Sequence, residues 1–169
     1  MSKNLQIVQK ISKVLGILAK IGFIMSLVGL VCCIVGLVLS LVGGLSQELA
    51  AKIVKEGDVT MKQVAGYCLG GLIICIVSVI VTKLHKDYFE MEQAAGTPFT
   101  QESAKAFRTL GIVNLVAPFI CTIMVAIVNS VFKINVDYHI DGSFATGIVM
   151  ILLSFVFAYG AELEEKAKS

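Results

Sequence analysis

The chain has 169 residues, of which 57% are hydrophobic, and its mean hydropathy is +0.89. Only 15% of the residues are charged, against roughly a quarter in an average soluble domain. A soluble domain of this length has no core large enough to hide so much apolar surface, which excludes an ordinary soluble enzyme or binding module. The formal net charge of +2 says little by itself, whereas the positions of the charges are informative.

Four long apolar stretches divide the chain, at residues 21–45, 64–84, 110–132 and 144–161. A helix needs about 20 apolar residues to cross the hydrocarbon layer, and its backbone amides must be bonded within the segment. We therefore predict an all-α polytopic membrane protein, in which a four-helix transmembrane bundle forms one domain over residues 1–169.

The basic residues predict which side of the membrane each segment faces. Ten lie before residue 21, from Lys83 to the start of the third span, and after the fourth span, and the other four lie in the two remaining segments. Lysine and arginine are retained on the cytoplasmic side, so both termini are predicted there. A cleaved signal peptide is the alternative at the N-terminus. Its apolar region has about 7–15 residues, shorter than the run that begins at Ile21, so we expect a retained anchor.

Residues 3–20 have the pattern of an amphipathic basic helix that leads into the first span. Apolar residues recur at helical spacing, and Lys3, Lys10, Lys13 and Lys20 lie among the residues of the other face. Such a helix can lie in the headgroup layer and sense anionic lipid. The alternative is a simple topology anchor, and we favour it.

Small residues form a regular seam along the first span. They are spaced by alternating steps of four and three residues: Gly22, Ser26, Gly29, Cys33, Gly36, Ser40 and Gly43. The second span has a similar seam that includes Gly71 and Ser78. Helices in lipid gain stability from close backbone approach, which small residues allow. The seam is predicted to pack helices together, against the second span, the fourth span or a second copy of the chain.

The segment between the second and third spans is predicted to be a cytoplasmic helical hairpin, residues 84–109, that stands clear of the bilayer. Gly96 suits the C-terminal cap of its first helix, and Thr100 suits the N-cap of its second. Pro118 then removes a backbone hydrogen bond from the third span and should bend it, and Asn114 is placed to bond the freed carbonyl.

The two segments on the other side of the membrane have weaker patterns. Residues 46–56 predict a short surface helix stopped by Gly57. Apolar and polar residues alternate over 134–140, which predicts a strand closed by the Asp141-Gly142 turn. Polar side chains on one face of that strand resemble a metal-ligand set, but a straight strand spaces them about 6.6 Å apart. A solvated edge is the favoured interpretation.

No residue pattern in the chain indicates catalysis or a bound metal or cofactor. The five cysteines all fall near the middle of predicted spans and form no C-x-x-C pair, so we expect small packing residues rather than ligands. The predicted span interiors lack ionisable side chains, which argues against ion-coupled transport. We expect no cofactor, no metal site and no enzymatic activity.

Two stretches carry a resemblance to a known family. Residues 88–112 include Gly-Thr-Pro-Phe-Thr-Gln-Glu-Ser-Ala-Lys from Gly96, followed by Arg108-Thr-Leu-Gly-Ile, and residues 155–165 read Phe-Val-Phe-Ala-Tyr-Gly-Ala-Glu-Leu-Glu-Glu. This resembles DUF2975, a family of uncharacterised bacterial membrane proteins, with Glu164 where glutamine is common. The resemblance covers about the last half of the chain. It implies a four-span protein of the bacterial plasma membrane, often encoded beside a small helix-turn-helix regulator, and it carries no catalytic residues to this sequence.

Two functions remain open at this point. The first is a membrane-embedded interaction or regulatory protein whose hairpin holds a partner, such as a small cytoplasmic DNA-binding regulator. The candidate contact residues are Tyr88, Phe89, Pro98, Phe99, Thr100 and Arg108. Membrane lipid and a second copy of the chain are further expected partners, and direct nucleic-acid binding is not expected. The aromatic side chains have a simpler use, which is to pack the hairpin on itself. The second function is transport, or immunity to a membrane-active peptide.

Overall fold

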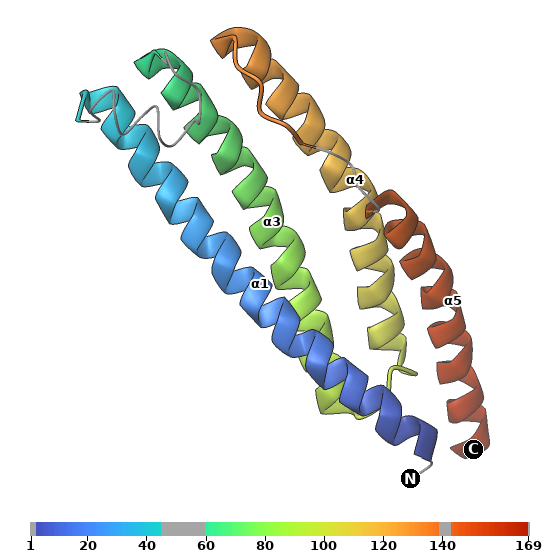
Figure 1. The fold of residues 1–169 in the computed structure, drawn as a ribbon. Coiled ribbons are helices and arrows are strands. Elements are labelled where there is room, and N and C mark those ends of the chain that lie inside the picture. The colour runs from blue at the N-terminus through green and yellow to red at the C-terminus, as the bar shows by residue number, and fades with distance from the viewer. Residues whose placement is uncertain (1–2, 45–59, 139–142, 169) are drawn as a thin grey trace. The chain divides into compact units, whose positions relative to one another are not determined.

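Four α-helices make up most of the computed structural model, which describes residues 3–44, 60–138 and 143–168 (Figure 1). The helices are α1 (Lys3–Val42), α3 (Met61–Ala95), α4 (Gln101–Phe132) and α5 (Ser143–Lys168). Each is long and apolar enough to cross a membrane, so the prediction of an all-helical, multi-pass chain is confirmed. The predicted surface helix over 46–56 and the Asp141-Gly142 turn lie outside the described residues.

The chain divides into two compact units, which are described separately. The first unit comprises Met1–Ile24, Ile80–Pro118 and Ile140–Ser169, and the second comprises Met25–Val79 and Phe119–His139. Three helices, α1, α3 and α4, contribute to both units, whereas α5 belongs to the first unit alone.

In the second unit, α1 and α3 meet through small residues. A Cβ atom added at Gly36 would lie 2.9 Å from the sulfur of Cys68, and one added at Gly71 would lie 3.0 Å from the sulfur of Cys33. Gly29 stands in the same relation to Cys75, at 3.1 Å. Cysteine here acts as a small apolar side chain that fits against a glycine of the facing helix. Of the three partners left open for the seam, the structure places it against the second span.

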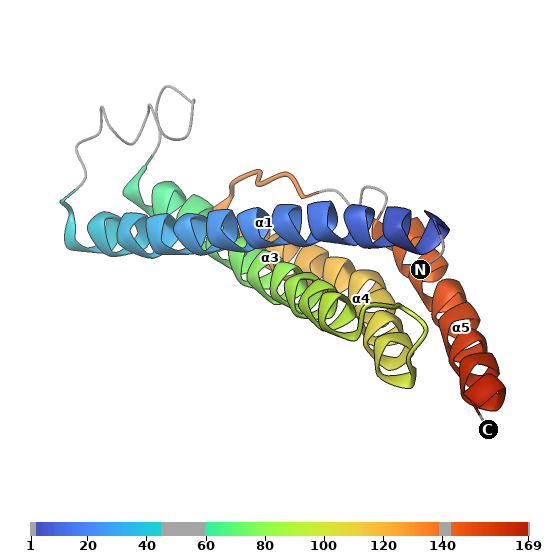
Figure 2. The same cartoon turned by 90° about the horizontal axis from the view of Figure 1, so that it is seen from below.

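The alternating segment after α4 is not a strand, so that prediction is wrong for residues 134–138. These residues are extended but pair with no other strand among the described residues (orange in Figure 2). Their alternate side chains pack on helices instead: Ile134 lies against Gly66, and Val136 lies against Gly70. Alternate residues of this segment do share one buried face, as the sequence predicts, but that face packs on α3 and α4 rather than within a sheet.

Asn129 holds this extended segment in place. Its side-chain amide donates to the carbonyl of Val136 at 3.1 Å and accepts from the Val136 amide at 2.9 Å. These bonds satisfy backbone groups of the segment that no neighbouring strand pairs. Lys133, at the turn that follows α4, has a φ of 53°, which lets the chain fold back on the helix it has just left.

In the first unit, residues 3–24 of α1 pack on the end of α3. The buried positions on this part of α1 are Ser12 and Gly16, whereas the apolar side chains of Ile11 and Leu18 are exposed. A Cβ atom added at Gly16 would lie 3.3 Å from the Cβ of Phe89. Small residues therefore line α1 for two turns before Gly22, and residues 3–20 are part of the same 40-residue helix as the first span.

Helices α4 and α5 come together at Gly111 and Gly147. A Cβ atom at either glycine would lie 2.8 Å from the backbone oxygen of the other. Asn114 lies in this contact. The sequence predicts that its side chain bonds the carbonyl freed by Pro118, and this prediction is wrong. Its amide donates to the carbonyl of Leu110 at 2.9 Å, one turn earlier. Proline at 118 frees the carbonyl of residue 114 itself, which the Asn114 side chain does not bond.

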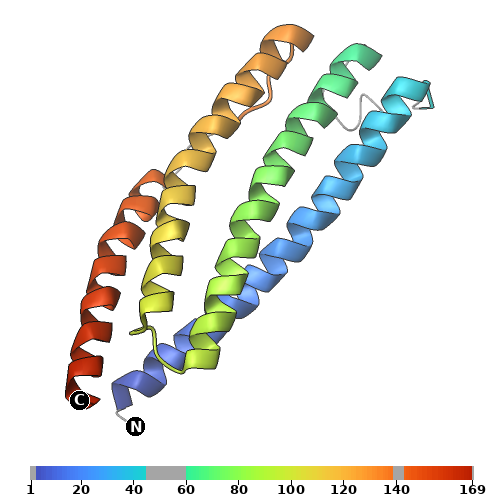
Figure 3. The same ribbon diagram turned by 180° about the vertical axis from the view of Figure 1, so that it is seen from behind.

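The hairpin between α3 and α4 has the ends that the sequence predicts (Figure 3). Gly96 follows the last residue of α3 with a φ of 71°, and the Thr100 hydroxyl accepts the Ser103 amide at 3.0 Å. Gly43 is predicted as a member of the seam, but it does not pack against another helix. It follows α1 with a φ of 72°, and an added Cβ would meet nothing within 4 Å. Gly43 thus ends α1 rather than packing it.

We expect Gly111→Ala to destabilise the protein by about 1–3 kcal/mol, although alanine favours a helix by about 1 kcal/mol over glycine. The new Cβ would lie 2.8 Å from the oxygen of Gly147 and 3.0 Å from the nitrogen of Ile151, both backbone atoms. Gly22→Ala is the control, because its Cβ would lie 3.5 Å from a methyl group of Thr82, an ordinary contact. Thermal unfolding in maltoside, followed by circular dichroism, measures both variants. Equal midpoints would contradict this packing.

Candidate functional site

The turn of the hairpin is fixed by side chains on both sides. Gln9 on α1 donates from its amide nitrogen to the carbonyl of Gly96 at 2.8 Å. The Phe99 amide donates to the Thr97 hydroxyl at 3.2 Å, and the Thr100 hydroxyl caps α4. Because a glycine, a short polar side chain and an N-cap each perform their usual role, the sequence forms this turn locally. The geometry of the turn fixes the positions of the residues that flank it.

A chain of aromatic contacts links the hairpin to α5. Tyr88 lies 5.0 Å from Phe107 between ring centroids, Phe107 lies 5.1 Å from Phe157, and Phe157 lies 5.9 Å from Phe99. Gly160 of α5 has no room for a side chain, because its Cβ would lie 2.5 Å from the Phe99 ring. The aromatic residues of the hairpin therefore pack on one another and on α5, as in the simpler of the two interpretations.

The six hairpin residues proposed to contact a partner lie in different surroundings. Tyr88 and Pro98 are buried, Phe89 and Thr100 are partly buried, and Phe99 and Arg108 are exposed. The guanidinium of Arg108 lies 4.4 Å from the centroid of the Phe155 ring, and its Nε lies 3.5 Å from the Ser154 hydroxyl. Of the six, Phe99 and Arg108 are therefore the two whose side chains are most accessible to another molecule.

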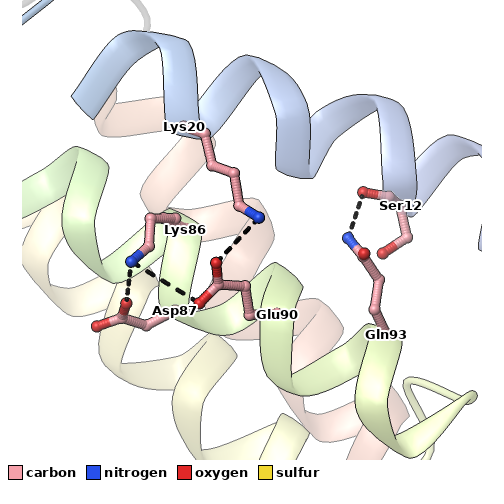
Figure 4. A network of polar contacts seen from close by, with 6 residues as sticks. All are labelled: Ser12, Lys20, Lys86, Asp87, Glu90 and Gln93. Atoms are coloured by element: carbon pink, nitrogen blue, oxygen red, sulfur yellow. Dashed lines mark hydrogen bonds and ion pairs between the residues drawn. The ribbon is translucent and has the colours of Figure 1, made fainter. Parts of the chain in front are cut away.

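A polar network joins α1 to α3 on the surface of the first unit (Figure 4). Lys20 pairs with Glu90 at 3.1 Å, and Lys86 lies 3.5 Å from Asp87 and 3.7 Å from Glu90. Exposed ion pairs of this kind contribute about 1 kcal/mol or less in water. In the same view, the Gln93 amide donates to the backbone carbonyl of Ser12 at 3.4 Å. The network sets the register of α1 on α3 more than it stabilises the fold.

The first unit also contains an open hollow of about 760 Å³, here called the aromatic cavity, whose lining includes exposed side chains of α1 such as Leu15 and Leu18. All four helices of the first unit contribute to it, and apolar side chains make up almost all of its wall. Five aromatic residues line it: Tyr88, Phe89, Phe99, Phe107 and Phe157. Its volume falls in the range of about 300–1,000 Å³ that is typical of ligand sites.

One acid, Glu92, faces the aromatic cavity. Its exposed fraction is 8%, and it also lines a smaller polar pocket of about 140 Å³ with Gln9, Ser12 and Gln93. The Glu92 carboxyl lies beside the hydroxyl groups of Tyr88 and Ser12. The Ser12 hydroxyl is buried and has no well-aligned hydrogen bond among the described residues. Glu92 and Ser12 were not among the residues selected from the sequence.

A second concave surface lies at the tip of the hairpin, and we call it the tip hollow. Its volume is about 400 Å³, and half of its wall is polar. The lining residues come from the turn and from the end of α5: Ala95, Thr97, Phe99, Thr100, Gln101, Ala161, Glu164 and Glu165. The tip hollow therefore combines one exposed aromatic ring with two carboxylates.

Within residues 3–44, 60–138 and 143–168, no three His, Cys, Asp or Glu side chains are placed to hold a metal ion. Comparison of the chain with known protein families, curated proteins and solved structures gives no match. The resemblance to DUF2975 therefore stays a prediction.

We expect Glu92→Gln to raise the free energy of unfolding at neutral pH by about 1 kcal/mol, because an unpaired charge no longer has to be buried. The amide has nearly the shape of the carboxylate. Glu90→Gln, two residues away, should have the opposite sign, because it removes the partner of Lys20 and Lys86. Thermal unfolding of both variants in maltoside tests this. A loss of stability in Glu92→Gln would show that the carboxylate has a stabilising partner after all.

Proposed function

We propose that the chain is a non-enzymatic interaction protein of the bacterial plasma membrane, with four crossings and both termini in the cytoplasm. The membrane part of this proposal is supported by exposed apolar side chains on every helix, such as Met25 on α1, Ile80 on α3, Ile123 on α4 and Leu152 on α5. Large apolar side chains exposed in such numbers require lipid around them. The orientation is supported by the distribution of lysine and arginine.

Charge is distributed unequally between the two units. The described residues of the second unit carry three charges, at Lys62, Lys133 and Asp137. In α1, residues 25–42 have no charge, and 18 helical residues measure about 27 Å, close to the hydrocarbon thickness of about 30 Å. The second unit therefore has the composition expected of a lipid-embedded part. The polar network and most of the charges belong to the first unit, together with the hairpin.

The apolar residues of α5 limit how far the hairpin can extend into the cytoplasm. Phe99 at the turn contacts Gly160, and Phe107 contacts Phe157, so the hairpin is packed beside the predicted fourth span. The charged end of α5 begins just beyond this contact, at Glu162. We therefore propose that the tip of the hairpin lies at the cytoplasmic membrane surface, rather than far from the bilayer as a free-standing hairpin would.

The tip hollow is the observation that favours a partner protein. Phe99 is 41% exposed there, beside the carboxylates of Glu164 and Glu165. An aromatic anchor with a charged rim is the usual composition of a protein-binding surface. The acidic rim favours a partner with basic side chains, which is the chemistry that a small DNA-binding regulator offers.

Cysteine labelling from the two sides of the membrane tests the topology. The five native cysteines are first replaced by alanine, and a single cysteine is then introduced as Ala94→Cys in the hairpin or Asn135→Cys after α4; both positions are exposed. We expect an impermeant maleimide to label Ala94→Cys only in inside-out vesicles and Asn135→Cys only in right-side-out vesicles. Permeabilised vesicles, in which both should react, are the control. Labelling of both from one side would refute the topology.

Photo-crosslinking in cells tests the partner. With p-benzoylphenylalanine in place of Phe99, we expect an adduct with a second protein, and at the lipid-facing Tyr159, which is 62% exposed, we expect none. Adding Glu164→Gln and Glu165→Gln should lower the adduct yield about twofold or more, because each exposed charge pair contributes about 0.2–1 kcal/mol. No adduct at 99, or a yield unchanged by the two substitutions, would contradict docking at the tip hollow. An adduct with a second copy of the chain would show that the tip hollow binds another copy of this chain rather than a different protein.

A further inference from the structure

Glu92 differs from the other acids of the hairpin in its surroundings. Glu90 and Asp87 are exposed and lie in ion pairs with lysine. Glu92 is buried, and no ion pair within the described parts of the chain includes it. Burying a carboxylate without a cationic partner is costly, so such groups are retained mainly where a ligand or a proton supplies the missing charge.

The remaining ionisable side chains around Glu92 do not neutralise it. His85 lines the aromatic cavity, but its Nδ1 is bonded to the backbone carbonyl of Val81 at 2.8 Å. Lys13 lines the small polar pocket without coming within ion-pair distance of the carboxylate. Tyr88 and Ser12 offer only hydroxyl groups. The carboxylate thus faces a large apolar space while its positive counterpart is missing.

The lining of the aromatic cavity limits the class of ligand that can bind there. A neutral acyl chain would fill the apolar space but leave the charge of Glu92 unbalanced. An anionic amphiphile would be repelled by it. A cation with an apolar body satisfies both features, because aromatic rings attract a positive charge through their faces and the carboxylate attracts it directly. The buried hydroxyl of Ser12 lines only the adjoining small polar pocket, where it offers one further acceptor beside Glu92.

We propose that the aromatic cavity is a binding site for lipophilic cations, with Glu92 as the counter-ion. This site goes beyond the proposed interaction with a partner protein. It shares only Phe99 with the tip hollow, and all of its lining residues belong to the first unit. The cation enters with its apolar body against the phenylalanine rings and its charge toward the end of the cavity where Glu92 meets the small polar pocket.

Two ions of the same shape and opposite charge test the site on the unmodified protein. Purified full-length protein in maltoside is titrated with radiolabelled tetraphenylphosphonium, and with tetraphenylborate as the matched anion. Micelles without protein provide the background for each. We expect saturable binding of the cation and none of the anion. Equal binding of both ions, or no saturable binding of the cation, overturns the proposal without the use of any variant.

Two neighbouring substitutions assign the charge to a residue. Glu92→Gln should weaken tetraphenylphosphonium binding about tenfold or more, which corresponds to the 1.5–3 kcal/mol of a charged contact. Glu90→Gln removes an equal charge from the same helix, two residues away and on the surface, and should leave binding unchanged. Equal affinity in Glu92→Gln and wild type, or an equal loss in both variants, overturns the assignment. Crosslinking at Phe99 is measured separately. A loss of cation binding therefore leaves the proposed partner interaction intact, and a missing crosslink leaves the proposed cation site intact.

Discussion

Close contact between backbones, at positions without a bulky side chain, is the constraint on which the rest of this structure depends. In lipid, a helix gains little by moving leucine from a hydrocarbon tail to another leucine, so association relies on dispersion contacts and on hydrogen bonds between helices. Gly36 against Cys68 and Gly111 against Gly147 are contacts of this kind, one in each unit. Each requires that a particular position stays small, and each leaves the large apolar side chains free to face outward.

The interior that results is unusual in composition. Alongside Leu110 and Val64, the most deeply buried residues include Ser103 and Ser154, and Asn114, Ser12 and Glu92 are buried as well. Most of these polar groups are satisfied locally. Ser154 bonds the carbonyl of Ile151, and Asn114 bonds that of Leu110. Glu92 differs from these groups because it carries a charge, and the side chains beside it, Tyr88 and Ser12, are neutral hydroxyls, which is why it stands out as a functional candidate.

The sequence predicts local features of this fold better than the partners of those features. Gly96 and Thr100 could be assigned as caps because the physical reason for each lies within four residues. The alternation over 134–138 was equally clear, but its side chains pack on Gly66 and Gly70, some 65 residues earlier in the chain. A period of two shows that one face is buried and says nothing of what buries it. The prediction for Asn114 is wrong for a related reason. The partner of its side-chain hydrogen bond depends on the side-chain rotamer and on the approach of α5.

The start of the small-residue seam shows how charge can mislead. Lys10, Lys13 and Lys20 give residues 3–20 the pattern of a surface helix, although Ser12 and Gly16 are further small residues on the N-terminal side of the seam. Lysine side chains are long enough to reach water from one face of a helix while the opposite face packs against protein. A helix with lysines is therefore not excluded from the packed interior, and α1 packs along α3 from Ser12 onward within the first unit.

Glu92 also bears on transport, which the sequence disfavours because the predicted span interiors lack ionisable groups. The predicted second span, residues 64–84, ends before Glu92. In the structure, Glu92 lines a cavity together with Met150 and Phe157, which belong to the apolar stretch of α5. Glu92 also lines the small polar pocket with Gly96 and Pro98 of the turn, so it lies where the apolar cavity meets the end of the hairpin. The position of an ionisable group in a membrane protein is thus set by the helix it faces, and one helix's hydropathy profile does not reveal it.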